Sequence, residues 1–166
     1  MEKAQKRNNG EKKLVMAFGT FDFFHDGHHH FLNRAKELGD FLIVIIARDK
    51  TVRQIKGEEP ANNERKRLKK VKSKGVADKV ILGYHKDKHK VLRKYRPDII
   101  ALGYDQYVFT QTLKKTLIDL KMNTQIQRLE AHFPQVYKSS LIRRQKEEDL
   151  TGEERVIPSR ALNYNQ

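Results

Sequence analysis

The chain has no cysteine among its 166 residues. This absence excludes disulfide bonds, thiolate zinc sites and a thiol nucleophile. Long apolar runs are missing as well, because the longest, Phe41 to Ala47, is too short to span a bilayer. The Lys-, Arg- and Asn-rich N-terminus is not followed by the apolar stretch of a signal peptide. We therefore expect a cytoplasmic protein with no membrane segment.

Acidic residues are few relative to basic ones. The chain has 21 Asp and Glu against 35 Lys and Arg, which gives a formal net charge of +14. Such an excess favours anionic partners such as nucleotides, phosphorylated substrates or nucleic acid, although a solvated basic face has the same composition. Seven of the basic residues crowd the segment from Arg65 to Lys74. That segment is the place to look for nucleic-acid contact, which we do not favour as the main function.

Apolar runs and helical patterns alternate along the chain. Leu14 to Phe18 is an unbroken apolar run of the kind that forms a strand buried on both faces of a parallel sheet. Further strands are expected at 41–47, 79–82, 98–102 and 125–129, with helices at 27–38, 62–74, 85–95 and 110–121, and a polar loop at 51–60. The alternation predicts an α/β fold with a doubly wound parallel five-stranded sheet and helices on both faces.

The stretch between the first strand and the first helix carries the chemistry. Gly19 permits a tight turn, and the helix that begins near Gly27 points its unpaired N–H groups and positive dipole end at one place, which suits a phosphate. His25 and His28 lie three residues apart, so both imidazoles fall on one face and can donate hydrogen bonds to phosphate oxygens. Gly27 leaves room for a polyphosphate to approach the backbone. Neither a Walker A loop nor G-x-G-x-x-G is present.

These residues form an ordered string, G-T-F-D-x-x-H-x-G-H-x-x-x-L-x-x-A-x-x-L-G-D, from Gly19 to Asp40. It resembles the signature of the cytidylyltransferase-like nucleotidyltransferases. That family has a Rossmann-like fold and joins a nucleoside monophosphate from CTP or ATP to a phosphate-bearing acceptor, with release of pyrophosphate. The resemblance also implies a homodimer and Mg²⁺ that arrives with the triphosphate, held by phosphates and water rather than by a dedicated protein site.

The resemblance assigns roles residue by residue. It implies that His25, His28 and Lys56 are catalytic, with Lys50 as a rival to Lys56. Thr20 and Phe21 would hold the α-phosphate region, Lys56 and Ser140 would close on the β- and γ-phosphates, and Gly103 and Asp105 would face the nucleoside. The full set of nucleotide-binding candidates is Gly19, Thr20, Phe21, Asp22, Gly27, Asp49, Arg65, Gly103, Tyr104, Asp105, Gln106, Ser139 and Ser140.

A second string separates the possible substrates. P-D-x-I-x-L-G-Y-D-Q, from Pro97 to Gln106, resembles the archaeal-type FAD synthases. The Arg-Thr-x-Gly-Ile-Ser/Thr segment of cytidylyltransferases that act on glycerol 3-phosphate is replaced by His132 to Lys138. ATP and FMN are therefore the leading substrates. A CTP-dependent enzyme acting on glycerol 3-phosphate or a related phosphoalcohol is the alternative, and a basic RNA-binding module on the same fold is a second one.

The expected domain plan has three parts. Residues 1–13 form a basic flexible arm, residues 14–143 form the nucleotidyltransferase domain, and residues 144–166 form a charged helix extension or tail.

Overall fold

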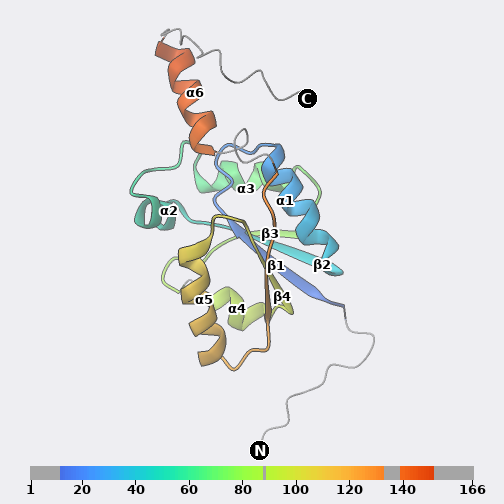
Figure 1. Ribbon diagram of the computed structural model, residues 1–166. Helices are drawn as coiled ribbons and strands as arrows, with labels where there is room; N and C mark the ends of the chain where they lie inside the picture. Colours follow the sequence, from blue (N-terminus) through green and yellow to red (C-terminus); the bar gives the residue numbers. More distant parts are fainter. Residues whose placement is uncertain (1–11, 88, 133–138, 152–166) are drawn as a thin grey trace, which may run out of the picture.

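Five parallel strands form the sheet in the computed structural model, which describes residues 12–87, 89–132 and 139–151. The strands are β1 (Leu14–Gly19), β2 (Phe41–Ile46), β3 (Lys79–Leu82), β4 (Ile99–Leu102) and β5 (Gln125–Arg128). Their order is β3-β2-β1-β4-β5 (Figure 1). From β1 to β3 the chain builds toward one edge of the sheet, and β4 and β5 then build toward the other, so the strand order reverses between β1 and β4. In sheets of this kind a ligand crevice lies outside the carboxyl ends of the strands at that reversal.

Helices cover both faces of the sheet, as the sequence predicts. Helices α1 (Asp26–Glu37) and α3 (Glu64–Lys72) pack on one face through Leu32, Ala35 and Val71. Helices α4 (Lys90–Tyr95) and α5 (Tyr107–Asp119) pack on the other through Leu92 and Leu113. The central strands are apolar at consecutive positions because both of their faces are covered. The fold is therefore the predicted Rossmann-like α/β arrangement.

The sequence-based prediction of a polar loop at 51–60 is wrong in its first half. Helix α2 (Asp49–Lys56) occupies it, and Gly57 ends the helix in the left-handed region with φ 76°. Val52 and Ile55 are the apolar residues of this helix, and Ile55 is exposed, so few residues mark a buried face. The helix depends instead on a distant partner, because the Glu64 carboxylate accepts the Asp49 N–H at 3.0 Å.

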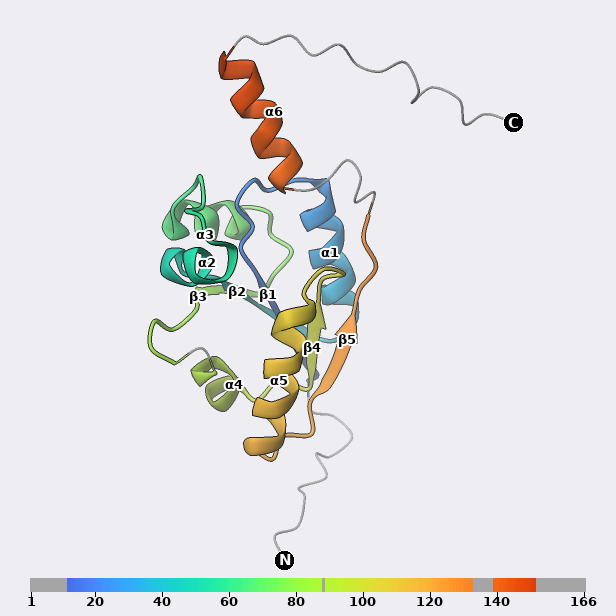
Figure 2. The same ribbon diagram turned by 60° about the vertical axis from the view of Figure 1, so that its left-hand side comes forward.

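Other element boundaries shift by a few residues. The helix expected at 85–95 begins only at Lys90, and α5 begins before the expected residue 110. Helix α6 (Ser139–Thr151) continues without a break across the expected domain boundary at 143–144. It extends from the end of the molecule at which β1 and β2 finish (Figures 1 and 2). Most of the expected arm and tail, residues 1–11 and 152–166, lies outside the described residues. Across the described ranges, no helix is both long and apolar enough to cross a membrane.

Candidate active site

His25 and His28 form a reciprocal cap at the start of α1. His25 is the N-cap, and its Nδ1 accepts the backbone N–H of His28 at 3.3 Å. The Nδ1 of His28 accepts the backbone N–H of His25 at 3.4 Å. The two rings stack with their centroids 3.8 Å apart. The three-residue spacing therefore brings both imidazoles together beside the helix N–H groups, where the positive end of the helix dipole lies.

This arrangement determines the protonation of the pair. Because each Nδ1 accepts an N–H, the proton of a neutral ring lies on Nε2, where it can be donated. Burial lowers the pKa of His28 to about 3, and the charges of His25 and Lys56 act in the same direction, against a backbone hydrogen bond at Phe23 and the charge of Asp22. Burial also lowers the pKa of His25, partly offset by Asp26. At neutral pH both rings are therefore uncharged, and each can donate a hydrogen bond from Nε2.

Gly19 and Phe21 hold the His28 ring in place. A Cβ added at Gly19 would lie 2.5 Å from a ring carbon of Phe21, so only glycine admits this ring over the end of β1. Phe21 adopts a φ of 53°, a left-handed conformation that is uncommon for a bulky residue. Its ring is 3% exposed and meets the His28 ring edge-on at 5.1 Å. The side chain of Phe21 thus supports a histidine, and only its backbone remains to serve the predicted phosphate contact.

Asp22 fixes the loop that precedes α3. Its carboxylate accepts the backbone N–H groups of Ala61 at 2.9 Å and Asn62 at 2.8 Å, and it forms an ion pair with Arg143 of α6 at 3.1 Å. Burial alone would raise the pKa of Asp22, but these donors outweigh it and lower that pKa. The carboxylate is therefore ionised, and its oxygens accept hydrogen bonds from protein groups.

Lys56 lies beside this aspartate, at the end of α2. A cavity of about 120 Å³ is lined by Thr20, Asp22 and Lys56, together with Glu58, Glu59 and Arg143 among others. The charge of Lys56 contributes to the lowered pKa of His28. Of the three residues predicted to be catalytic, the structure stacks His25 on His28 and places Lys56 in a cavity that Thr20 and Asp22 also line.

Arg67 is a central residue of the site that sequence reasoning missed. Its side chain is wholly buried and donates to the backbone oxygens of Thr20 at 2.6 Å, Ala47 at 2.8 Å and Asn62 at 2.8 Å. It also pairs with the Asp49 carboxylate at 2.6 Å. Arg67 therefore ties together the segments that follow β1 and β2. The sequence did hold one indication of this burial. Arg67 lies four residues before Val71, so the two side chains share the buried face of α3.

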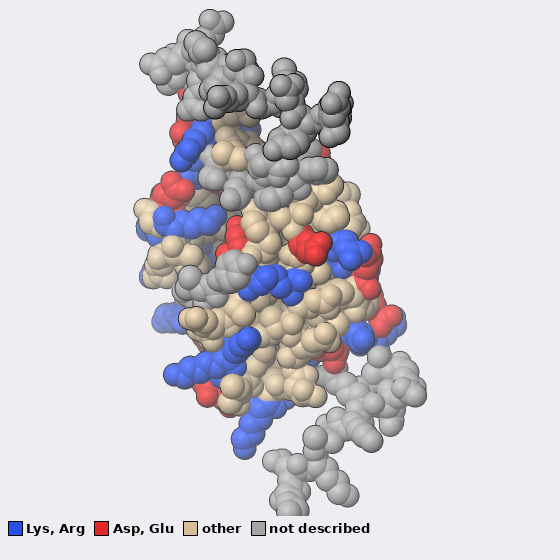
Figure 3. Space-filling view, in the orientation of Figure 1, with Lys and Arg blue, Asp and Glu red and all other residues tan. Residues whose placement is uncertain are grey.

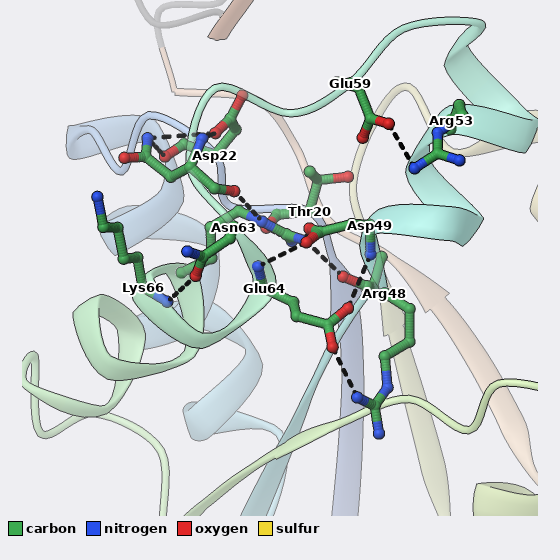
Figure 4. A network of polar contacts seen from close by, with 12 residues as sticks. Thr20, Asp22, Arg48, Asp49, Arg53, Glu59, Asn63, Glu64 and Lys66 are labelled. Atoms are coloured by element: carbon green, nitrogen blue, oxygen red, sulfur yellow. Dashed lines mark hydrogen bonds and ion pairs between the residues drawn. The ribbon is translucent and has the colours of Figure 1, made fainter.

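Two of the predicted nucleotide ligands near Arg67 have different surroundings. Arg65 is exposed on α3. Asp49 exchanges hydrogen bonds with Glu64, which in turn pairs with Arg48 at 2.7 Å, so that the starts of α2 and α3 cap each other (Figure 4). Burial alone would raise the pKa of Glu64, but the Asp49 N–H and the Arg48 guanidinium outweigh burial and lower that pKa. The contacts of the Asp49 carboxylate are to protein groups, and its predicted nucleotide contact stays a prediction.

The turn after β4 reaches the crevice from the other side. The Gln106 side chain accepts the Gly103 N–H at 2.9 Å and donates to the Phe18 backbone oxygen at 2.9 Å, which joins the ends of β4 and β1. Arg128 of β5 holds the Gly103 oxygen at 2.6 Å. Burial and the neighbouring Asp105 raise the pKa of Tyr104. Gly103 and Gln106 shape this turn, and exposed Asp105 stands at its tip.

The remaining predictions concern α6 and the metal. Ser139 and Ser140 begin α6, and their side chains lie outside what the structure describes. The substituted segment after His132, residues 133–138, is outside it too. Within the described ranges no three His, Asp or Glu side chains are grouped to hold a metal ion.

Comparison with known proteins decides the family. The family described as Cytidylyltransferase-like matches residues 16–145, which is most of the chain. The chain belongs to this family. It is therefore a nucleotidyltransferase, and the H-x-G-H string that the structure places at the N-terminus of α1 is the family's signature.

Individual relatives within the cytidylyltransferase-like family agree. The chain is 42% identical over 130 residues to a protein named FAD synthase from Picrophilus torridus, covering 78% of this chain and 93% of that one. It is 41% identical over 139 residues to a FAD synthase from Thermoplasma acidophilum, covering 84% and 96%. A crystal structure described as a lipopolysaccharide core biosynthesis protein from Thermoplasma volcanium superposes with a TM-score of 0.69 at 38% identity, covering 74% of this chain and 99% of that one.

Proposed function

We propose that this nucleotidyltransferase is an FMN adenylyltransferase, which joins AMP from ATP to the phosphate of FMN. The names of the relatives above 40% identity support the substrates. The observation that carries the chemistry is the neutral, stacked pair of His25 and His28 at the α1 N-terminus with Lys56 nearby. Such a site offers donors and a cation to a triphosphate without an enzyme nucleophile.

The transfer balances as a single displacement. An oxygen of the FMN phosphate forms a bond to the α-phosphorus of ATP, and the bond from that phosphorus to the oxygen bridging to the β-phosphate breaks. Pyrophosphate leaves with the electron pair. The attacking oxygen already carries charge, so no general base is required, and catalysis rests on positioning and charge stabilisation.

Each residue then has a defined task. The two Nε2–H groups and the N–H groups of α1 donate to phosphate oxygens, and they lie in a fixed orientation because the reciprocal cap holds both rings. Lys56 meets the negative charge that builds on the leaving pyrophosphate. Mg²⁺ bound to the triphosphate supplies further charge neutralisation. Mg²⁺ would be held mainly by phosphate oxygens and water.

A substrate panel tests the proposal. The purified protein with Mg²⁺ is supplied with ATP or CTP and with FMN or glycerol 3-phosphate, and pyrophosphate release and FAD are measured. We expect FAD only from ATP with FMN. Turnover of CTP with glycerol 3-phosphate in place of that pair would contradict the acceptor and nucleotide, while no pyrophosphate from any pair would contradict transfer itself.

A pair of histidine variants tests the site. His28→Ala should lower the rate by about 10²–10³, the effect of removing one charge-stabilising donor. His29→Ala is the matched control, since His29 is exposed and contacts Asn33 on its own helix. Equal rates in the two variants would show that the stacked pair is not the transfer site.

We also propose a homodimer, which the family resemblance supports. Light scattering at several protein concentrations tests this proposal, and a constant monomer mass would overturn it.

A further inference from the structure

Asp22 borders a second depression as well as the cavity that Lys56 lines. This Phe23 groove has a volume of about 380 Å³ and is formed by the loop before α1, by α3 and by α6. Its aromatic wall is Phe23 and Phe24, and three lysines line it, Lys66 and Lys70 of α3 and Lys146 of α6. Asp22 borders both cavities, so the groove adjoins the transfer site without including its histidines.

Lysine ammonium groups bracket the aromatic wall. The Lys146 Nζ lies 4.9 Å from the centre of the Phe23 ring, and the Lys74 Nζ lies 5.2 Å from the centre of the Phe24 ring. Cations at these distances are attracted by the ring faces. The groove therefore combines positive charge with flat apolar surface, drawn from two helices and one loop.

Asp22, the acidic residue that lines the groove, is already paired. The Asp22 carboxylate is occupied by two backbone N–H groups and by Arg143. Within the described ranges, neither Lys66 nor Lys70 forms an ion pair with an acidic side chain. Lys and Arg are interspersed with Asp and Glu on the face drawn in Figure 3. In the lining of the groove, Lys66, Arg67, Lys70 and Lys146 stand against the single acidic residue Asp22, which is a local excess of positive charge.

The lysines are spaced for an extended ligand. Lys66 and Lys70 are four residues apart on one helix face, which separates them by about 6 Å along the axis. This is the scale of the distance between successive phosphates of a nucleic-acid backbone. Lys74 continues the row in the turn that closes α3. A row of cations beside aromatic rings is the combination by which single strands are bound without sequence readout.

We infer that the Phe23 groove binds single-stranded nucleic acid, with phosphates on Lys66, Lys70 and Lys146 and a base against Phe23. This binding is separate from the transfer reaction and does not require the proposed substrates. It is expected to be salt-sensitive, because each phosphate contact releases a condensed counterion.

Fluorescence anisotropy with a labelled oligouridylate of about 12 nucleotides, within the range of known single-strand site sizes, tests the inference. The full-length protein is compared with the triple variant Lys66→Gln, Lys70→Gln, Lys146→Gln. Three lost contacts should reduce the slope of log affinity against log salt by about 2, at 0.7 per contact. The charge-matched control is Lys86→Gln, Lys114→Gln, Lys115→Gln, three exposed lysines of the β3–α4 loop and α5. An equal loss in both variants, or none in the first, would overturn the groove assignment.

A second variant separates a nucleic acid from a bare phosphate chain. Phe23→Leu keeps an apolar side chain but removes the ring, so it should weaken oligouridylate binding by roughly tenfold, as loss of one stacked base does. Inorganic polyphosphate should be unaffected by it. Equal binding of both ligands to the parent and to Phe23→Leu would mean that the groove recognises charge alone, and the nucleic-acid inference would fail.

Discussion

A histidine is an unusual helix cap, and at His25 this choice has a chemical reason. Ser, Thr, Asp or Asn would serve the N-cap better, but none of them is an imidazole. Capping through Nδ1 fixes the ring and leaves its proton on Nε2. One side chain thus begins the helix and presents a donor at the helix N-terminus. The structural and chemical roles share a residue but use different ring atoms, so they can be separated by substitution.

A pair of substitutions separates them. His25→Ala removes both roles and should lower the free energy of unfolding by about 0.5–2 kcal/mol together with the transfer rate. His25→Asn restores a side-chain acceptor for the His28 N–H, so it should recover most of that stability while the rate stays low. Urea unfolding and initial-rate assays on both variants provide the measurement. Full activity in His25→Asn would mean that His25 acts only as a cap.

The pKa of His28 predicts a pH dependence of stability. The ordinary value is 6.5 and the folded value is about 3, so between these values the unfolded chain binds a proton that the native state does not. The free energy of unfolding should therefore fall as pH falls through this window, by at most about 1.4 kcal/mol per pH unit from this residue.

His28→Gln is the matched variant for this measurement. Glutamine at this position of a capping box can still reach the N-cap backbone N–H but does not titrate. Between pH 6.5 and 4.5 its stability should fall less steeply than that of the parent. Parallel curves would show that His28 is readily protonated in the folded protein.

At the scale of elements, structure that depends on consecutive residues can be predicted from the sequence, whereas structure that depends on contacts between distant residues cannot. The β1–turn–α1 unit follows from consecutive residues, an apolar run, Gly19 and a helical repeat, and the structure confirms it. Helix α2 does not follow, because its cap comes from Glu64 in another helix. The role of Arg67 is hidden for the same reason, since its four acceptors come from segments up to 47 residues away.

Removing Arg67 tests how far α3 organises the site. Arg67→Met keeps the buried stem but removes the donor to the backbone oxygens of Thr20, Ala47 and Asn62, and it removes the cation paired with the Asp49 carboxylate. Breaking a buried ion pair in this way costs about 3–5 kcal/mol, so the variant should unfold at much lower urea concentration. Exposed Arg65→Met should change stability by less than about 0.5 kcal/mol.

The same pair tests the predicted nucleotide contact of Arg65. If Arg65 binds the triphosphate, Arg65→Met should raise the KM for ATP while its unfolding curve matches the parent. Unchanged kinetics in a folded Arg65→Met would remove Arg65 from the site.

At the scale of the whole molecule, the sheet order and the charge act on the same place. The chain reversal between β1 and β4 puts the crevice beside the α1 N-terminus, and Lys56, Arg143 and the α3 lysines surround that end of the molecule. A net charge of +14 repels itself in the compact state. We therefore expect anions bound at this end to relieve the repulsion and to couple substrate binding to folding stability.

Thermal unfolding in salt and in tripolyphosphate separates general screening from site binding. Sodium chloride should raise the melting temperature gradually, since the screening length is about 10 Å at 0.1 M. Tripolyphosphate should raise it further at matched ionic strength, because a ligand at 100 times its Kd adds about 2.7 kcal/mol to the native state. His25→Asn should lose part of this extra shift through the α1 site, and the groove triple variant should lose another part, while both keep the response to sodium chloride. Equal shifts from the two salts in the parent would mean that the positive charge acts only by repulsion and that neither anion site is formed.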